Sequence, residues 1–293
     1  TKSEVILHFL IRIHMVKKAL LVGINKYAGS PLRGCINDVQ DVATLLVNKY
    51  AFGKPDIRLL CDERATSENI KSRLRELVGL LKNEEDLGVF HYSGHGSQIA
   101  VRRGDTWEPD NLNELICPID MNWDNPRSFI TDDDFYEIFL GLKGRLLWIS
   151  DSCHSGDLTR EVNFRKSKAG EKIIKDIKPR YLEPPIDLAW RLEGYSEITA
   201  NKPVIKKANL NNVYFISGCE SNQTSADACF KNRYSGALTK TLVDLIAKEN
   251  AGALDVNILK AKLHSNMAKF GFSQRPTIEV SANNISLNTF MMT

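Results

Sequence analysis

The chain has 293 residues, of which 43% are apolar and 26% are charged, and its formal net charge at pH 7 is +3. These proportions are those of an ordinary globular protein, and the length allows one large domain or two small ones. The net charge is too small to indicate nucleic-acid binding, and no stretch reaches the roughly 18 consecutive apolar residues of a membrane span.

Apolar runs of strand length alternate with helical patterns along the first half of the chain. Continuous apolar runs predict buried parallel strands, and apolar residues at helical spacing predict the helices between them. Ser67 is expected to cap its helix. Strands are predicted at 18–25, 57–61, 87–92, 115–118 and 145–150, and helices at 38–50, 67–81 and 131–140.

The second half continues this alternation after a different segment. Residues 158–207 carry 12 Lys and Arg against 7 Asp and Glu, include four prolines and lack a strand pattern. We interpret this basic linker as a long excursion, either a solvated loop or an exposed processing loop. Strands follow at 213–218 and 277–280, with helices at 235–248 and 255–270. Such alternation predicts an α/β fold with a mostly parallel sheet.

The cysteine pattern indicates where the protein is located. Six cysteines occur without a CxxC pair or a disulfide-framework spacing, so they are expected to be reduced and the protein cytoplasmic.

Met15 with Val16-Lys17-Lys18 resembles a natural start. Residues 1–15 are therefore interpreted as an extension, derived from an expression vector or from an alternative upstream start.

Two of the predicted strands end in small residues beside a thiol and an imidazole. Tyr92-Ser93-Gly94-His95-Gly96 follows one run, and Asp151-Ser152-Cys153-His154-Ser155-Gly156 follows another. Strand ends of a parallel sheet share one edge, where active sites lie. A thiol becomes a strong nucleophile when a histidine holds its proton. We therefore predict Cys153 as nucleophile and His95 as general base, with the amides of Gly96 and Cys153 as an oxyanion hole.

These motifs, with others around them, resemble the metacaspases and the bacterial orthocaspases of the caspase-like cysteine peptidases. The resemblance covers roughly residues 16–281. It rests on Ala19–Asn25, Leu32–Asp38, Glu108-Pro109-Asp110, Glu114, Pro118-Ile119-Asp120, Ile130–Asp133, Ile216–Cys219, Gln223–Ala226 and Gly236–Thr239.

The resemblance implies a caspase-like fold, with a central sheet of about six strands flanked by helices on both faces. A large portion at 16–157 and a small portion at 208–293 would complete one domain around the linker at 158–207. It also implies a monomeric endopeptidase that acts through an acyl-enzyme on protein or peptide substrates with Arg or Lys before the scissile bond. The residues that match the family's substrate pocket are Cys35, Asp38, Ser93 and Asp151.

Two alternatives to that activity stay open. The first is cleavage after Asp, against which stands Asp151-Ser152 before the cysteine, where aspartate-specific caspases have Gln-Ala. The second is a non-catalytic caspase-fold interaction module, which would usually lack the cysteine or the histidine.

Calcium and self-processing are two further expectations. Many metacaspases are calcium-activated, and Asp132 and Asp133 match their acidic pair, near Asp105, Asp110 and Asp134. The chain departs from the family pattern at Thr159-Arg160, and the acidic run equally suits a helix N-terminus. No cofactor is expected for the chemistry itself. If the enzyme cleaves after basic residues, it would also cut its own linker. The candidate sites are Arg160, Arg165, Lys166, Lys168 and Lys172.

Overall fold

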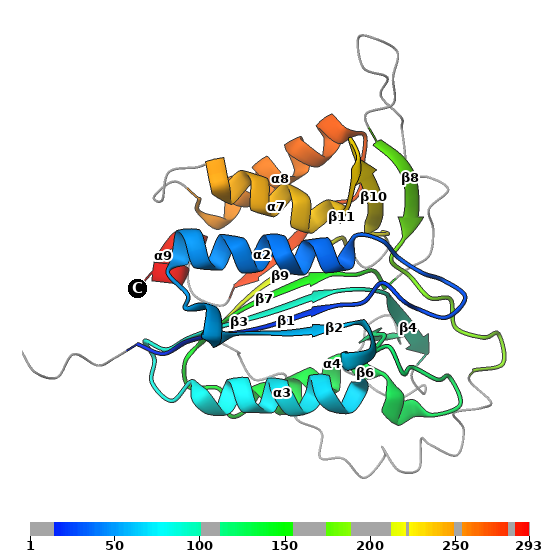
Figure 1. Cartoon of the computed structure of the whole chain (residues 1–293), viewed down its shortest axis with the longest axis horizontal. Coiled ribbons are helices and arrows are strands. Elements are labelled where there is room, and N and C mark those ends of the chain that lie inside the picture. The colour runs from blue at the N-terminus through cyan, green and yellow to red at the C-terminus, as the bar shows by residue number, and fades with distance from the viewer. Residues whose placement is uncertain are drawn as a thin grey trace, which may run out of the picture.

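The computed structural model describes residues 15–100, 112–154, 174–188, 212–220, 223–248, 254–280 and 285–292. A central sheet has the strand order β12-β9-β7-β3-β1-β2 (Figure 1). Neighbouring strands are parallel except β12, which is antiparallel to β9. Its strands are β1 (Lys17–Gly23), β2 (Ile57–Cys61), β3 (Leu87–Ser93), β7 (Arg145–Asp151), β9 (Val213–Ser217) and β12 (Thr277–Val280).

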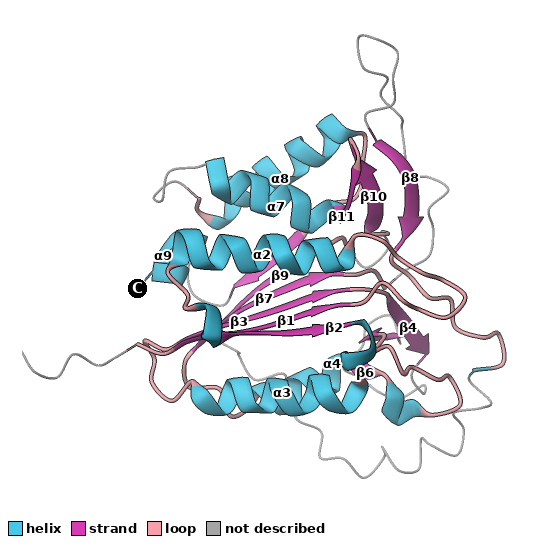
Figure 2. Ribbon diagram, in the orientation of Figure 1, coloured by secondary structure: helices cyan, strands magenta, loops and turns pink. Residues whose placement is uncertain are grey.

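Helices cover both faces of this sheet, as Figures 1 and 2 show. On one face lie α2 (Cys35–Tyr50), α7 (Ala237–Lys248), α8 (Val256–Phe270) and the short α9 (Leu287–Met292); on the other lie α3 (Ser67–Leu80) and α4 (Asp132–Phe139). Each face has its own apolar core. The predicted α/β architecture with helices on both faces is therefore confirmed.

The inner strands of the central sheet are mostly buried because their side chains alternate between the two cores. Every residue of β3 is buried. Val89 packs in the core under α2 and α7, whereas its neighbour Phe90 packs in the core under α3 and α4. A strand covered on both sides reads as a continuous apolar run, which is why these strands can be predicted from the sequence.

Polar caps fix where several helices begin. Thr66, one residue before the predicted cap Ser67, accepts a hydrogen bond from the N–H of Asn69 at the start of α3. Thr131 and Asp134 form a capping box at α4, each side chain accepting from the other's main-chain N–H. Asp255 caps α8 in the same way as Thr66 caps α3.

Two small sheets flank the carboxyl ends of the central strands. One has the order β4-β5-β6, with β4 (Gly96–Ala100), β5 (Leu112–Ile116) and β6 (Ile130–Thr131). The other has the order β11-β10-β8, with β8 (Ile174–Pro179), β10 (Ala226–Phe230) and β11 (Arg233–Gly236).

These small sheets correct two predictions. The linker at 158–207 was expected to lack strands, yet β8 lies within it, because β10 supplies an antiparallel partner from a distant part of the chain. The helix predicted at 235–248 starts at Ala237, because residues 233–236 pair with β10 as β11.

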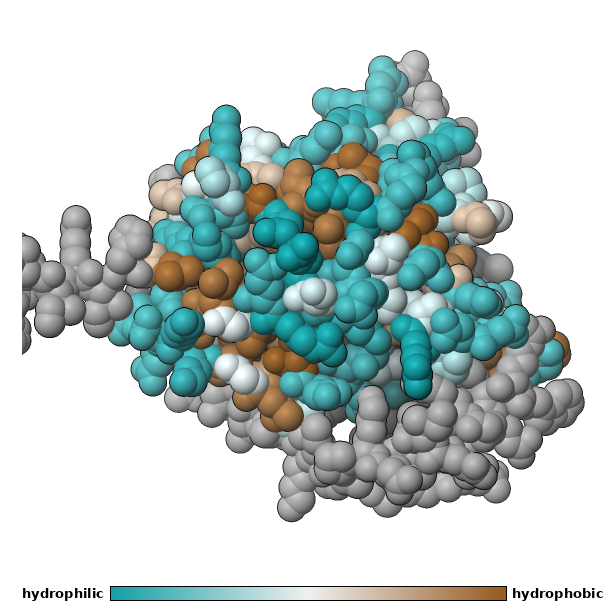
Figure 3. Space-filling view, turned by 60° about the horizontal axis from the view of Figure 1, so that its bottom comes forward, coloured by the Kyte–Doolittle hydropathy of each residue, from teal (hydrophilic) through white to brown (hydrophobic). Residues whose placement is uncertain are grey.

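One face of the described surface is mixed in character. In the space-filling view, apolar side chains form several small areas separated by hydrophilic ones (Figure 3). Among the described helices, none combines the length and the apolar character needed to cross a membrane.

Candidate active site

The catalytic candidates lie at one edge of the central sheet, where β3 and β7 end side by side. Ser93, the last residue of β3, is in register with Asp151, the last residue of β7. His95 and Cys153 each follow their strand by two residues, and both are fully buried. The parallel pairing therefore brings the two motifs of the sequence together.

His95 is held in one orientation by its neighbours. Its main-chain N–H donates to the hydroxyl of Tyr27 (3.0 Å), whose ring lies 4.5 Å from the imidazole. Nε2 lies 2.8 Å from the carbonyl oxygen of Ser30. A carbonyl oxygen only accepts, so Nε2 carries the proton and Nδ1 carries the lone pair. Nδ1 is buried and has no hydrogen-bond partner.

Burial also sets the charge of this histidine. It lowers the pKa of the His95 imidazole to about 4, although the Ser30 carbonyl acts in the opposite direction. The ring is therefore neutral at pH 7, as a group that accepts a proton must be.

Cys153 contacts the loop that precedes β10. Its Sγ accepts a hydrogen bond from the N–H of Ser225 (2.7 Å) and lies 3.1 Å from the Ser225 carbonyl oxygen. The main-chain N–H of Cys153 points elsewhere, to the carbonyl oxygen of Arg180 (3.2 Å). The N–H of Gly96 donates to that same oxygen (3.0 Å). The two amides singled out in the sequence thus converge on one carbonyl group.

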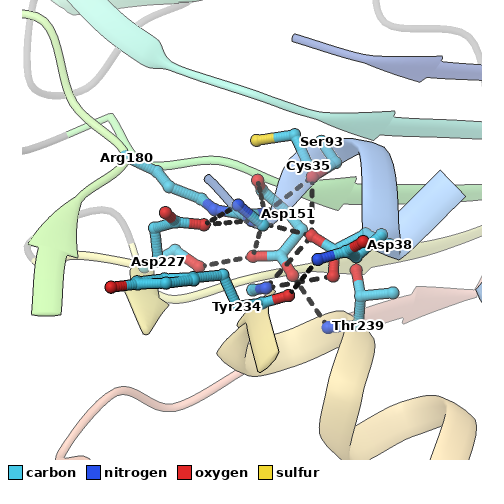
Figure 4. A network of polar contacts seen from close by, with 12 residues as sticks. Cys35, Asp38, Ser93, Asp151, Arg180, Asp227, Tyr234 and Thr239 are labelled. Atoms are coloured by element: carbon cyan, nitrogen blue, oxygen red, sulfur yellow. Dashed lines mark hydrogen bonds and ion pairs between the residues drawn. The ribbon is translucent and has the colours of Figure 1, made fainter. Parts of the chain in front are cut away.

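The side chain of Arg180 lies in a buried acidic pocket (Figure 4), and Arg180 is fully buried. Its Nη2 donates to Asp38 (2.7 Å) and Asp227 (3.0 Å). Its Nη1 donates to the Ser93 hydroxyl (2.8 Å) and the Asp151 carbonyl oxygen (3.0 Å), and lies 3.3 Å from the Asp151 carboxylate. The pocket therefore surrounds one guanidinium with three carboxylates, from α2, β7 and β10.

The main chain and nearby hydroxyls hold each carboxylate in place. Asp38 accepts from the N–H of Gly236 (3.0 Å) and from the Ser93 hydroxyl (2.8 Å). Asp151 accepts from the N–H of Thr239 (2.8 Å) and from the Ser225 hydroxyl (2.7 Å). These bonds come from elements far apart in sequence, so the pocket is built by the fold as a whole.

Burial and charge oppose one another in this pocket. Burial raises the pKa of Asp38 to about 6, although Arg180 acts to lower it. Burial would lower the pKa of Arg180. The acidic groups around it, among which Asp151 has the largest effect, hold that pKa well above its usual range. Burial also raises the pKa of the Cys35 thiol beside Ser93, so Cys35 lines the pocket as a neutral group.

The chain on either side of Arg180 is extended and bound as an added strand. Before it, β8 pairs antiparallel with β10, and the N–H of Arg180 donates to the Ser225 carbonyl (3.0 Å). After it, the N–H of Leu182 donates to the Gly96 carbonyl (3.0 Å), and the hydroxyl of Ser97 donates to the Leu182 carbonyl (2.6 Å). The peptide bond between Arg180 and Tyr181 thus lies beside Cys153, with partners on both sides.

Several known proteins are similar in sequence to this chain. The model of the metacaspase peptidase C14 domain matches residues 17–160. Metacaspase-8 of Arabidopsis thaliana is 40% identical over 172 residues, covering 56% of this chain and 42% of that protein. Metacaspase-1 of Meyerozyma guilliermondii is 30% identical over 301 residues, covering 90% of this chain and 69% of that protein. The chain belongs to the metacaspase family.

The chain spans less than two thirds of the length of several curated relatives. It covers 42% of the Arabidopsis protein and 62% of Metacaspase-1 of Scheffersomyces stipitis. A crystal structure of a Geobacter sulfurreducens protein has a TM-score of 0.64 and 23% identity, with 90% of this chain and 92% of that chain covered. That likeness supports the caspase-like fold.

The metacaspase pocket contains two residues that the sequence analysis did not predict. Asp227 follows the motif Gln223–Ala226 directly, and the available signal was a single acid inside the otherwise apolar strand β10. Arg180 is one of the 12 basic residues in the linker, and nothing local distinguishes it from the others. The predicted pocket residues Cys35, Asp38, Ser93 and Asp151 do lie together.

The calcium prediction for this metacaspase is untested. Asp132 and Asp133 begin α4, where Asn113 donates to Asp133 (3.4 Å). No group of three or more His, Cys, Asp or Glu side chains suited to a metal ion occurs in the part of the chain that the structure describes. Asp105 and Asp110 lie outside the described residues, as do the candidate processing sites Arg160, Arg165, Lys166, Lys168 and Lys172.

Proposed function

We propose that this metacaspase is a cysteine endopeptidase that hydrolyses peptide bonds after arginine or lysine. One observation carries the proposal: a basic side chain fills the acidic pocket while its own carbonyl oxygen receives the amides of Gly96 and Cys153. This is the placement that a substrate residue needs for attack on its carbonyl carbon.

The geometry supports a Cys-His mechanism. Nδ1 of His95 accepts the thiol proton once Cys153 leaves its bonds to Ser225, and the thiolate attacks the carbonyl carbon. The amides of Gly96 and Cys153 stabilise the negative oxygen that results. His95 then gives its proton to the leaving amine, and water hydrolyses the thioester, returning the thiol and releasing the carboxyl product.

The pocket charge supports the choice of substrate. Three buried carboxylates stabilise a cation, whereas an aspartate side chain in the same place would be repelled by all of them. Cleavage after Asp is therefore disfavoured, and the basic preference follows from residues contributed by three separate elements.

We also propose that the chain cuts itself between Arg180 and Tyr181. Support comes from the same hydrogen bonds, which hold Arg180 as a bound substrate residue and extend the chain on both sides of the bond. An uncut chain keeps its own pocket filled. Activity toward other substrates would therefore follow the release of this segment.

The test uses matched peptide reporters that end in Arg, Lys or Asp, with and without calcium. We expect cleavage of the basic reporters by the wild-type chain and none by Cys153→Ala; the calcium arm tests Asp132 and Asp133. Mass spectrometry of the fragment ends should find a cut after Arg180, which Arg180→Gln removes. Cleavage of the Asp reporter would refute the pocket assignment. A binding activity that survives in Cys153→Ala, with no reporter cut, would favour an interaction module.

A further inference from the structure

Asp227 faces the bound guanidinium from a fixed position. It lies on β10 and is 1% exposed, and its Oδ1 is 3.0 Å from Nη2 of Arg180. Oδ1 also accepts from the N–H of Gly34 (3.0 Å), and Oδ2 accepts from the N–H of Arg33 (2.9 Å). Because main-chain groups hold both oxygens, this carboxylate cannot follow a ligand of a different shape without losing those bonds.

The pocket presents two separate sets of acceptors. One set faces Nη1 and consists of the Ser93 hydroxyl and the carbonyl and carboxylate oxygens of Asp151. The other faces Nη2 and consists of the carboxylates of Asp38 and Asp227. A planar guanidinium carries one terminal nitrogen for each set.

A lysine side chain does not match this arrangement. Its charge sits on a single nitrogen, at the place that Cζ of an arginine occupies, one covalent bond short of Nη1 and Nη2. That nitrogen can approach one set of acceptors and leaves the other without a donor. A buried carboxylate that loses its cationic partner is strongly unfavourable even when main-chain N–H groups still bond to it, so the mismatch weakens lysine binding.

We infer that Asp227 determines specificity by making this pocket select arginine over lysine. The inference rests on the proposed function, since it assumes that substrates enter the pocket as Arg180 does. Asp38 and Asp151 alone provide one carboxylate on each side of the cation. Asp227 adds a second carboxylate on the Nη2 side, where arginine places a whole nitrogen and lysine places none.

The experiment compares Arg and Lys reporters on chain that has completed self-processing. The wild-type chain should prefer Arg by about 100-fold in kcat/KM, the equivalent of about 3 kcal/mol. Asp227→Asn should reduce that preference at least about 10-fold, through a higher KM for the Arg reporter. Asp41→Asn is the control, because Asp41 carries the same charge and pairs with Arg233 (2.9 Å) outside the pocket; its preference should stay at the wild-type value.

A second variant leaves Asp227 untouched. Arg180→Lys should slow the cut after residue 180 by about 10- to 100-fold, whereas Lys178→Arg, on the same strand, should not change it. Equal losses on both reporters in Asp227→Asn, or an unchanged rate in Arg180→Lys, would overturn the inference. A wild-type chain that cuts no reporter and does not cut itself would instead refute the proposed function.

Discussion

The acidic pocket and the proposed catalytic pair, His95 and Cys153, lie at the same edge of the sheet, yet they differ in how completely they are bonded. In the pocket, each oxygen of the Asp38, Asp151 and Asp227 carboxylates has a partner. At the catalytic pair, Nδ1 of His95 has none, and the thiol of Cys153 contacts the main chain of Ser225. The binding half of the site, formed by the three carboxylates, is therefore fully hydrogen-bonded. The chemical half, formed by His95 and Cys153, keeps one acceptor, Nδ1 of His95, without a hydrogen bond.

The difference follows from charge. Buried carboxylates are tolerated only when they are paired and hydrogen-bonded, so folding must complete the pocket. A thiol group and a neutral imidazole lose much less than a carboxylate when one atom lacks a partner. A fully bonded pocket and an imidazole with an unpaired acceptor suit the proposed mechanism, in which Cys153 leaves its bonds to Ser225 and gives its proton to His95.

The largest expected effect is at the chemical half. A Cβ at position 96 would overlap the carbonyl oxygen of Cys153, so Gly96→Ala should displace one of the two amides that meet the Arg180 carbonyl. Loss of such a donor lowers kcat by about 100- to 1000-fold. Reporter kinetics would measure it, with Gly79→Ala as the control, because a Cβ there meets nothing within 4 Å. A wild-type kcat in Gly96→Ala would mean that this amide has no part in catalysis.

The second effect is at the binding half. A Cβ at position 236 would overlap the Asp151 carboxylate and the guanidinium of Arg180. Gly236→Ala should therefore lower kcat/KM for an Arg reporter by about 100-fold, mainly through KM, because a broken buried ion pair costs about 3 kcal/mol or more. An unchanged KM would show that substrates do not use this pocket. Circular dichroism would verify that the variant is folded.

The smallest effect concerns His91, a fully buried residue of β3 that contacts Thr239 (3.2 Å). Burial lowers its pKa to about 4, so the folded state resists protonation. Its stabilising contribution is present above pH 6.5 and is lost as the pH falls toward 4, by about 2 kcal/mol at pH 5. Urea unfolding at pH 7 and pH 5 should show a smaller difference for His91→Leu than for the wild type. Equal differences would show that His91 is already protonated or exposed at pH 5.

The predicted strands of the central sheet match the structure in its middle and at its edges. The runs at 18–25, 87–92 and 145–150 correspond to β1, β3 and β7, whose largely buried residues leave an apolar signal. The predictions at 57–61 and 277–280 coincide with the partly exposed edge strands β2 and β12. β8 was not predicted because its apolar residues, Ile174 and Ile177, are three positions apart instead of two, and its partner β10 lies about 50 residues away. Pairing of that kind depends on tertiary structure, which local patterns do not encode.

The predicted site shows the same limit. Ser93 and Asp151 end β3 and β7, and Cys35 and Asp38 lie in the first turn of α2. All four belong to motifs, so their grouping could be predicted from the resemblance. Arg180 could not, because its role depends on the contact between the linker and β10 rather than on neighbouring residues. That Arg180 fills the pocket can therefore be recognised only in the folded chain.

The added strand at β8 has a consequence for rates. Because Arg180 is attached to the enzyme that binds it, its local concentration in the pocket is set by the chain and is unaffected by dilution. A cut made within one molecule is a first-order process, with the same half-time in dilute and concentrated samples. If the chain acts as proposed, external peptides would compete with this tethered segment at a disadvantage until the segment is released.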